Sequence, residues 1–98
     1  MRKSIYSLEY AVFARRLREA RLVAGLKQTE LAARLEKPHS YISRIENRQI
    51  RVDVIELKQI CDALGVPFRR FINELADELA DELADESKKD FSQPTETE

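Results

Sequence analysis

The stretch QTELAARLEKPHSYISRIEN, residues 28 to 47, holds two short apolar patterns with a proline between them. A helix over residues 28 to 35 would bury one face, made of Leu31, Ala32 and Leu35. A second helix, over about residues 39 to 46, would bury Tyr41, Ile42 and Ile45. Pro38 fits the first turn of that second helix, where its missing N–H is no loss. The stretch therefore predicts two short helices joined by a tight turn.

Helical spacing continues on both sides of this stretch. Apolar residues recur every three or four positions from Leu8 to Ala24, and Gly25 follows as a left-handed stop. Downstream, Asp53 and a glutamate three residues later form a capping box for a fourth helix, which Gly65 ends. Pro67 then opens a fifth helix. With only two glycines and three prolines, the chain is predicted to be all-α, with five helices.

The charges of the chain are divided between its two ends. Residues 1 to 73 hold 15 Lys and Arg against 8 Asp and Glu, whereas residues 74 to 98 hold 2 against 10. A length of 98 residues and a hydrophobic content of 43% are typical of one small domain. A basic globular part indicates a polyanionic partner, because lysine and arginine that neutralise phosphates release condensed counterions. A solubilising surface would give the same composition.

The acidic end contains a four-residue unit repeated three times, ELADELADELADE, residues 74 to 86. In a helix, this repeat places an inclined leucine ridge beside small alanines; the ridge consists of Leu75, Leu79 and Leu83. Three interpretations remain open: a solvated extension, a dimerisation helix, and an acidic segment that contacts the basic half or another basic protein. We accordingly divide the chain into a domain over residues 1–73, this extension, and a disordered tail over residues 87–98.

Taken together, three motifs resemble the Xre or lambda-repressor-like (Cro-like) helix-turn-helix family. They are LREARLVAGLKQTELAARL, then SYISRIEN, then an amphipathic fourth helix ending in ALGV. The resemblance covers Phe13 to Leu64, about half of the chain, and it is specific because the motifs stand at the right separation. It implies the helix-turn-helix fold and binding to double-stranded DNA, with the helix near residues 39 to 46 in the major groove.

The resemblance also implies roles for individual residues. The base-contacting positions of the recognition helix are His39, Ser40, Ser43 and Arg44, of which Arg44 can bond guanine in a bidentate way. The expected phosphate contacts are Lys27, Gln28, Thr29, Asn47, Arg48 and Arg51, although the basic ones would look the same as ordinary surface charges. Arg21 and Glu46 match a partly buried ion pair that ties the first helix to the end of the third.

Two positions depart from the family pattern. Glu36 and Arg48 stand where many members have glycine. A non-glycine residue in left-handed geometry costs about 1 kcal/mol, so either the turn geometry shifts or stability is sacrificed. We expect the exact turn to differ from the family's, and the third helix to end near Asn47, a residue that tolerates left-handed geometry.

The sequence favours a homodimeric transcription regulator that reads a pseudo-palindromic DNA site and acts as a repressor. The alternative is an adaptor or antitoxin-like module whose main partner is a protein. An enzyme is not predicted, because His39 stands alone and no phosphate-binding loop occurs. No cofactor or metal is expected, since the one cysteine, Cys61, lies on a buried stripe without partner ligands. The start lacks a signal-peptide pattern, which indicates a cytoplasmic protein.

Overall fold

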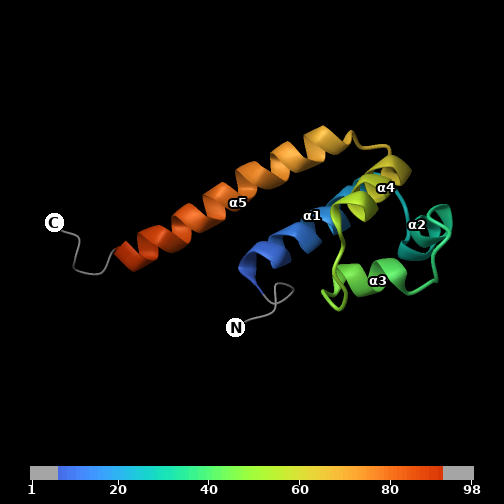
Figure 1. The fold of residues 1–98 in the computed structure, drawn as a ribbon, viewed down its shortest axis with the longest axis horizontal. Helices are drawn as coiled ribbons and strands as arrows, with labels where there is room; N and C mark the ends of the chain where they lie inside the picture. The colour runs from blue at the N-terminus through green and yellow to red at the C-terminus, as the bar shows by residue number, and fades with distance from the viewer. Residues whose placement is uncertain (1–6, 92–98) are drawn as a thin grey trace.

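The computed structural model describes the backbone of residues 7–91 and the side chains of residues 7–82. Within that range the chain forms five helices and no strand: α1 (Leu8–Val23), α2 (Gln28–Arg34), α3 (Tyr41–Glu46), α4 (Val54–Leu64) and α5 (Phe68–Phe91). Figure 1 shows the three short helices gathered at one end of α1, while α5 returns along α1 as a long rod. The predicted all-α, five-helix architecture is confirmed.

The ends of the helices follow from local chemistry. The Ser7 side-chain oxygen accepts the N–H of Tyr10 at 3.0 Å and caps α1, and Gly25, with φ 76°, ends that helix. At α4, Asp53 and Glu56 exchange backbone-to-carboxylate hydrogen bonds of 2.8 and 2.9 Å. The predicted stop at Gly25 and the predicted capping box are therefore both confirmed.

The third helix begins later than the sequence predicted. Pro38 is not in its first turn: the N–H of Tyr41 bonds the carbonyl oxygen of Pro38 at 3.0 Å, and the helix starts at Tyr41. Because that bond closes a turn ahead of the helix, His39 and Ser40 lie in the turn and not on the helix itself. The prediction of a helix from residue 39 was wrong by two residues.

The two turns that flank this helix keep a left-handed residue. Glu36 has φ 57° and Arg48 has φ 59°, whereas Asn47 has φ −90° and stays out of the left-handed region. Of the two alternatives, strained backbone at Glu36 and Arg48 is therefore the one observed. The third helix ends near Asn47 as predicted, but the left-handed residue is Arg48 and not Asn47. The chain retains the strained geometry, at a cost of about 1 kcal/mol for each non-glycine residue.

The core lies where α1, α2, α3, α4 and the start of α5 meet. Its aromatic centre is an edge-to-face pair, with the rings of Phe13 and Phe71 6.4 Å apart and inclined at 85°. The other buried members of the core are Leu17, Leu31, Ala32, Ile42, Ile45, Leu57, Ile60, Cys61 and Leu64. Burial raises the pKa of the Cys61 thiol to about 11, which disfavours the reactive thiolate. Cys61 is thus a core residue, as predicted.

The fifth helix is longer than the sequence indicated. It continues to Phe91, so the first five residues of the predicted disordered tail are helical, and residues 92–98 lie outside the described range. Leu75 packs against the core of its own chain, and Leu79 is half-buried. The side chain of Leu83 lies outside the described residues. No helix within residues 7–91 is both long and apolar enough to cross a bilayer.

Candidate nucleic-acid interface

The short helix α3 is apolar on its inner side and polar on its outer side. Ile42 and Ile45 are 3% and 1% exposed, so the helix is anchored along one face. Of the four predicted base-contacting residues, His39, Ser40 and Arg44 are exposed. Ser43 is half-buried, and its hydroxyl accepts a hydrogen bond of 3.4 Å from the Asn47 amide. The structure thus exposes three of the four side chains: His39 and Ser40 in the turn before α3, and Arg44 in its last turn.

A buried ion pair fixes the angle of α3 relative to α1. Arg21 Nε and Nη2 donate to the two carboxylate oxygens of Glu46 at 2.7 and 3.0 Å, and the two side chains are only 8% and 4% exposed. Arg21 also donates through Nη1 to the carbonyl oxygen of Leu26 at 2.8 Å. This confirms the ion pair. Because two hydrogen bonds join the guanidinium to both carboxylate oxygens, the two groups have little freedom to rotate, which orients the end of α3.

The start of α2 connects to the same ion pair. The Gln28 side-chain amide donates to Glu46 Oε1 at 2.9 Å, so this predicted phosphate contact already has a partner inside the protein. An amide nitrogen carries two N–H groups, which leaves one for another acceptor. Thr29 and Lys27 are exposed beside it, and the backbone N–H of Lys27 donates to Glu30 at 2.7 Å. Lys27, Gln28 and Thr29 therefore form one surface at this helix start.

The loop that follows α3 carries the remaining predicted phosphate contacts. Asn47, Arg48 and Arg51 are all exposed in it. The Tyr10 hydroxyl holds this loop from α1, because it donates to the Ile50 carbonyl oxygen at 3.3 Å and accepts the Val52 N–H at 3.1 Å. Burial raises the pKa of the Tyr10 phenol. Sequence reasoning missed this residue, since only the fold brings residues 10 and 50 together.

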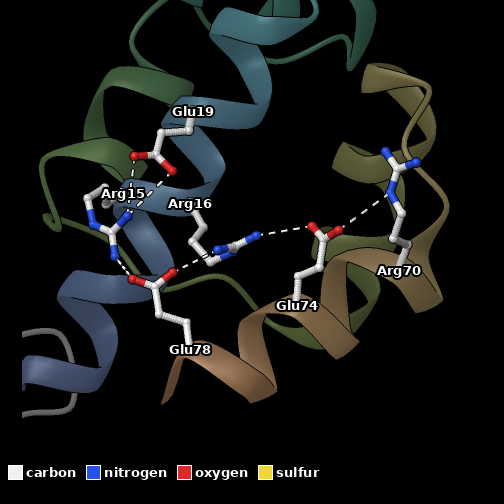
Figure 2. Close-up of polar contacts among 6 residues, drawn as sticks. All are labelled: Arg15, Arg16, Glu19, Arg70, Glu74 and Glu78. Carbon is white, nitrogen blue, oxygen red and sulfur yellow. Dashed lines mark hydrogen bonds and ion pairs between the residues drawn. The ribbon is translucent and has the colours of Figure 1, made fainter. Parts of the chain in front are cut away.

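A second set of ion pairs, between α1 and α5, was not predicted residue by residue (Figure 2). Arg16 donates to Glu78 at 2.7 Å and to Glu74 at 3.0 Å, and Arg15 is bonded to Glu78 and to Glu19. The acidic repeat thus contacts the basic half of its own chain, one of the three interpretations left open by the sequence. The opposite charges at positions 15, 16, 74 and 78 were the available signal.

The residues that the structure describes contain no group of three or more His, Cys, Asp or Glu side chains that could hold a metal ion.

Comparisons with known proteins agree with this geometry. A family model described as helix-turn-helix, HTH_3, matches residues 17–71. An XRE-family-like protein from Pseudomonas syringae pv. tomato str. DC3000 superposes with a TM-score of 0.68 at 38% identity, covering 71% of this chain and 85% of that one. The clp gene regulator ClgR from Corynebacterium glutamicum superposes with a TM-score of 0.70 at 26% identity, covering 91% and 98%. The search of curated proteins gives no match.

Proposed function

Because this chain belongs to the XRE-type helix-turn-helix family of DNA-binding transcription regulators, we propose that it is a homodimeric repressor that reads a pseudo-palindromic operator. Occupancy of the operator would block transcription, and α3 would read the bases. The observation that carries this proposal is the surface around α3: exposed Arg44 stands on a helix whose other side is buried, and exposed His39 and Ser40 lie in the turn just before that helix. We also propose a cytoplasmic location, which is where DNA lies in the bacteria of the two similar solved proteins.

Within this proposal, Arg44 has the largest share of base discrimination. Its guanidinium can donate two parallel hydrogen bonds to guanine O6 and N7 in the major groove. His39 and Ser40 can hydrogen-bond to several different bases and therefore discriminate less between them. Ser43 contributes less, since its hydroxyl already accepts from Asn47. Contacts to backbone phosphates before and after α3 fix the position of that helix along the DNA. They are made by Lys27, Gln28, Thr29, Asn47, Arg48 and Arg51.

Selection of bound duplexes from a random pool tests the proposed DNA site. We expect a motif with two-fold symmetry, whose half-sites lie about one helical turn apart, roughly 34–36 Å. Arg44→Ala should lose about 1–3 kcal/mol of discrimination at one position of the selected motif, while Arg51→Ala should weaken all sequences alike. Equal losses for Arg44→Ala on the selected and on a scrambled duplex would contradict the base-reading role.

The proposed dimer uses the ridge of α5. Leu75 contributes mainly to its own core, so the surface offered to a second copy centres on Leu79 and continues toward Leu83. Exposed Ala76 and Ala80 support this assignment, because small side chains let two helices approach closely. The acidic neighbours oppose it, since like charges along two paired rods repel.

Sedimentation equilibrium tests the dimer directly. The wild-type chain should sediment as a dimer, and Leu79→Asn should shift it toward the monomer because the ridge loses its apolar centre. Asp81→Asn is the matched control: it changes an exposed neighbour on the same helix and should leave the dimer intact. A monomeric wild-type chain would reject the dimer and favour the adaptor function, in which the exposed acids of α5, Asp77 and Asp81, meet a basic protein.

A further inference from the structure

A pocket of about 500 Å³ lies between α1 and the end of α3. It is lined by two alanines of α1 and by six polar residues: Arg15, Arg18, Gln28, Glu46, Asn47 and Arg48. Two of these residues, Arg15 and Arg18, lie on α1 outside every contact expected from the helix-turn-helix motif. The pocket therefore widens the polar surface of the molecule from α3 onto α1.

The pocket is strongly basic. Arg15, Arg18 and Arg48 are exposed in its walls, and the one carboxylate among them, Glu46, is already paired with Arg21. Within residues 7–82, the side chains of Arg18 and Arg48 make no hydrogen bond or ion pair with another residue. Three guanidinium groups around one hollow, two of them without a counter-charge, form a site for an anion.

The backbone at Arg48 supports a role for its side chain. This residue holds φ 59°, a left-handed conformation in which glycine would be relaxed and arginine costs about 1 kcal/mol. Strain of this kind persists at functional positions, where the side chain contributes something that glycine lacks. At this position the contribution is a guanidinium in the wall of the pocket.

The pocket is continuous with the surface assigned to DNA phosphates. Gln28 and Asn47, which line it, belong to that surface. A DNA strand carries one phosphate for every 3.4 Å or so of helix axis, so a strand held at Gln28 and Asn47 continues with further charges on either side. We propose that this pocket binds a backbone phosphate of duplex DNA through Arg15, Arg18 and Arg48, and thus extends the interface onto α1. This rests on the proposed function.

The acidic helix α5 competes with that phosphate for one wall of the pocket. Glu78 is bonded to Arg15, which Figure 2 shows between Glu78 of α5 and Glu19 of α1. Arg15 is 45% exposed, so water and salt reach the pair and an incoming phosphate can replace the carboxylate. Removal of the Glu78 charge should therefore strengthen binding, while removal of the Arg18 charge should weaken it.

The test is a titration of the full-length chain onto a random-sequence duplex, followed by fluorescence anisotropy from about 50 to 200 mM salt. Arg18→Gln should lower affinity about three- to fivefold and reduce the slope of log affinity against log salt by about 0.9, the value for one lost phosphate contact. Arg69→Gln removes the same charge from an exposed site at the start of α5, outside the pocket, and should change both quantities less. Equal effects of the two variants would overturn the proposal.

Two α5 variants form the second arm. Glu78→Gln should raise affinity by up to about fivefold, and Asp77→Asn, which removes one exposed charge from the same helix, should raise it less. If both raise it equally, α5 acts only through net charge and the competition for Arg15 is wrong.

A third arm identifies the source of the phosphate. Replacing chloride by phosphate at constant ionic strength should change the melting temperature of the wild-type chain and of Arg18→Gln equally. If free phosphate stabilises only the wild-type chain, and Arg18→Gln binds the duplex normally, the pocket takes a small ligand and the proposed DNA contact is wrong. A wild-type chain that binds no duplex at any salt concentration would instead overturn the proposed function, and this role of the pocket with it.

Discussion

Helix α1 makes arginine–glutamate pairs on two sides, and the two sides differ in their access to water. Arg21 and Glu46, toward α3, are 8% and 4% exposed, whereas Arg15 and Glu78, toward α5, are 45% and 22% exposed. Buried charges that lose a partner remain desolvated, whereas exposed ones are rescued by water and screened by salt. The buried Arg21–Glu46 pair therefore stabilises the packing of α3 on α1, whereas the exposed Arg15–Glu78 pair can be weakened by salt or replaced by another anion.

The largest loss of stability should follow when the buried Arg21–Glu46 pair is broken. Glu46→Gln leaves the Arg21 charge out of water without its counter-charge, and we expect the free energy of unfolding in urea to fall by about 3–5 kcal/mol. The loss should persist at high salt, because the pair is closed to ions. A loss below about 1 kcal/mol would remove the contrast between the two sides.

Removal of the Tyr10 hydroxyl is expected to give the second-largest loss of stability. Tyr10→Phe removes the bonds to Ile50 and Val52 and should cost about 1–2 kcal/mol in urea denaturation, with a uniform loss of DNA affinity as the loop loosens. Tyr41→Phe is the matched control, because within the described residues its hydroxyl makes no hydrogen bond. Similar losses in both variants would mean that the loop does not depend on Tyr10.

Glycine at the strained positions should raise stability. Arg48→Gly and Glu36→Gly should each increase the free energy of unfolding by about 0.5–1 kcal/mol, since both residues hold a left-handed backbone. Their effects on DNA should differ: Arg48→Gly should bind random duplex more weakly, and Glu36→Gly should not. Arg48→Gln separates the causes, because it removes the charge and keeps the strain. Weaker binding without a gain in stability is its expected result.

The smallest loss of stability should follow when the exposed ion pairs between α1 and α5 are broken. Glu78→Gln should reduce stability by less than about 1 kcal/mol at low salt and by nothing measurable at 1 M salt, once Arg15 and Arg16 are screened. The measurement is urea denaturation at the two salt concentrations. A large, salt-independent loss would place this contact in the same class as Arg21 and Glu46.

Much of the fold was predictable because its causes are local. The periodicity of Leu31 and Ala32, and later of Leu57 and Ile60, depends only on residues within two turns, and the structure buries all four. The same holds for the glycine stops and for the Asp53 cap. Even so, the start of α3 was misplaced by two residues, because the Pro38 carbonyl could either continue a helix or close a turn.

The sequence by itself determined which segments are helical, which face of each is apolar, and that the two ends of the chain carry opposite charge. The family resemblance added the pairing of Arg21 with Glu46. Only the tertiary structure decided that Tyr10 holds the loop at Ile50, that α5 lies beside Arg15 and Arg16, and that two arginines of α1 and one from the loop after α3 line one pocket. The physical reason is separation along the chain: helical periodicity is set within a few residues, whereas contacts between residues some 40 to 60 positions apart depend on how the packed helices fit together.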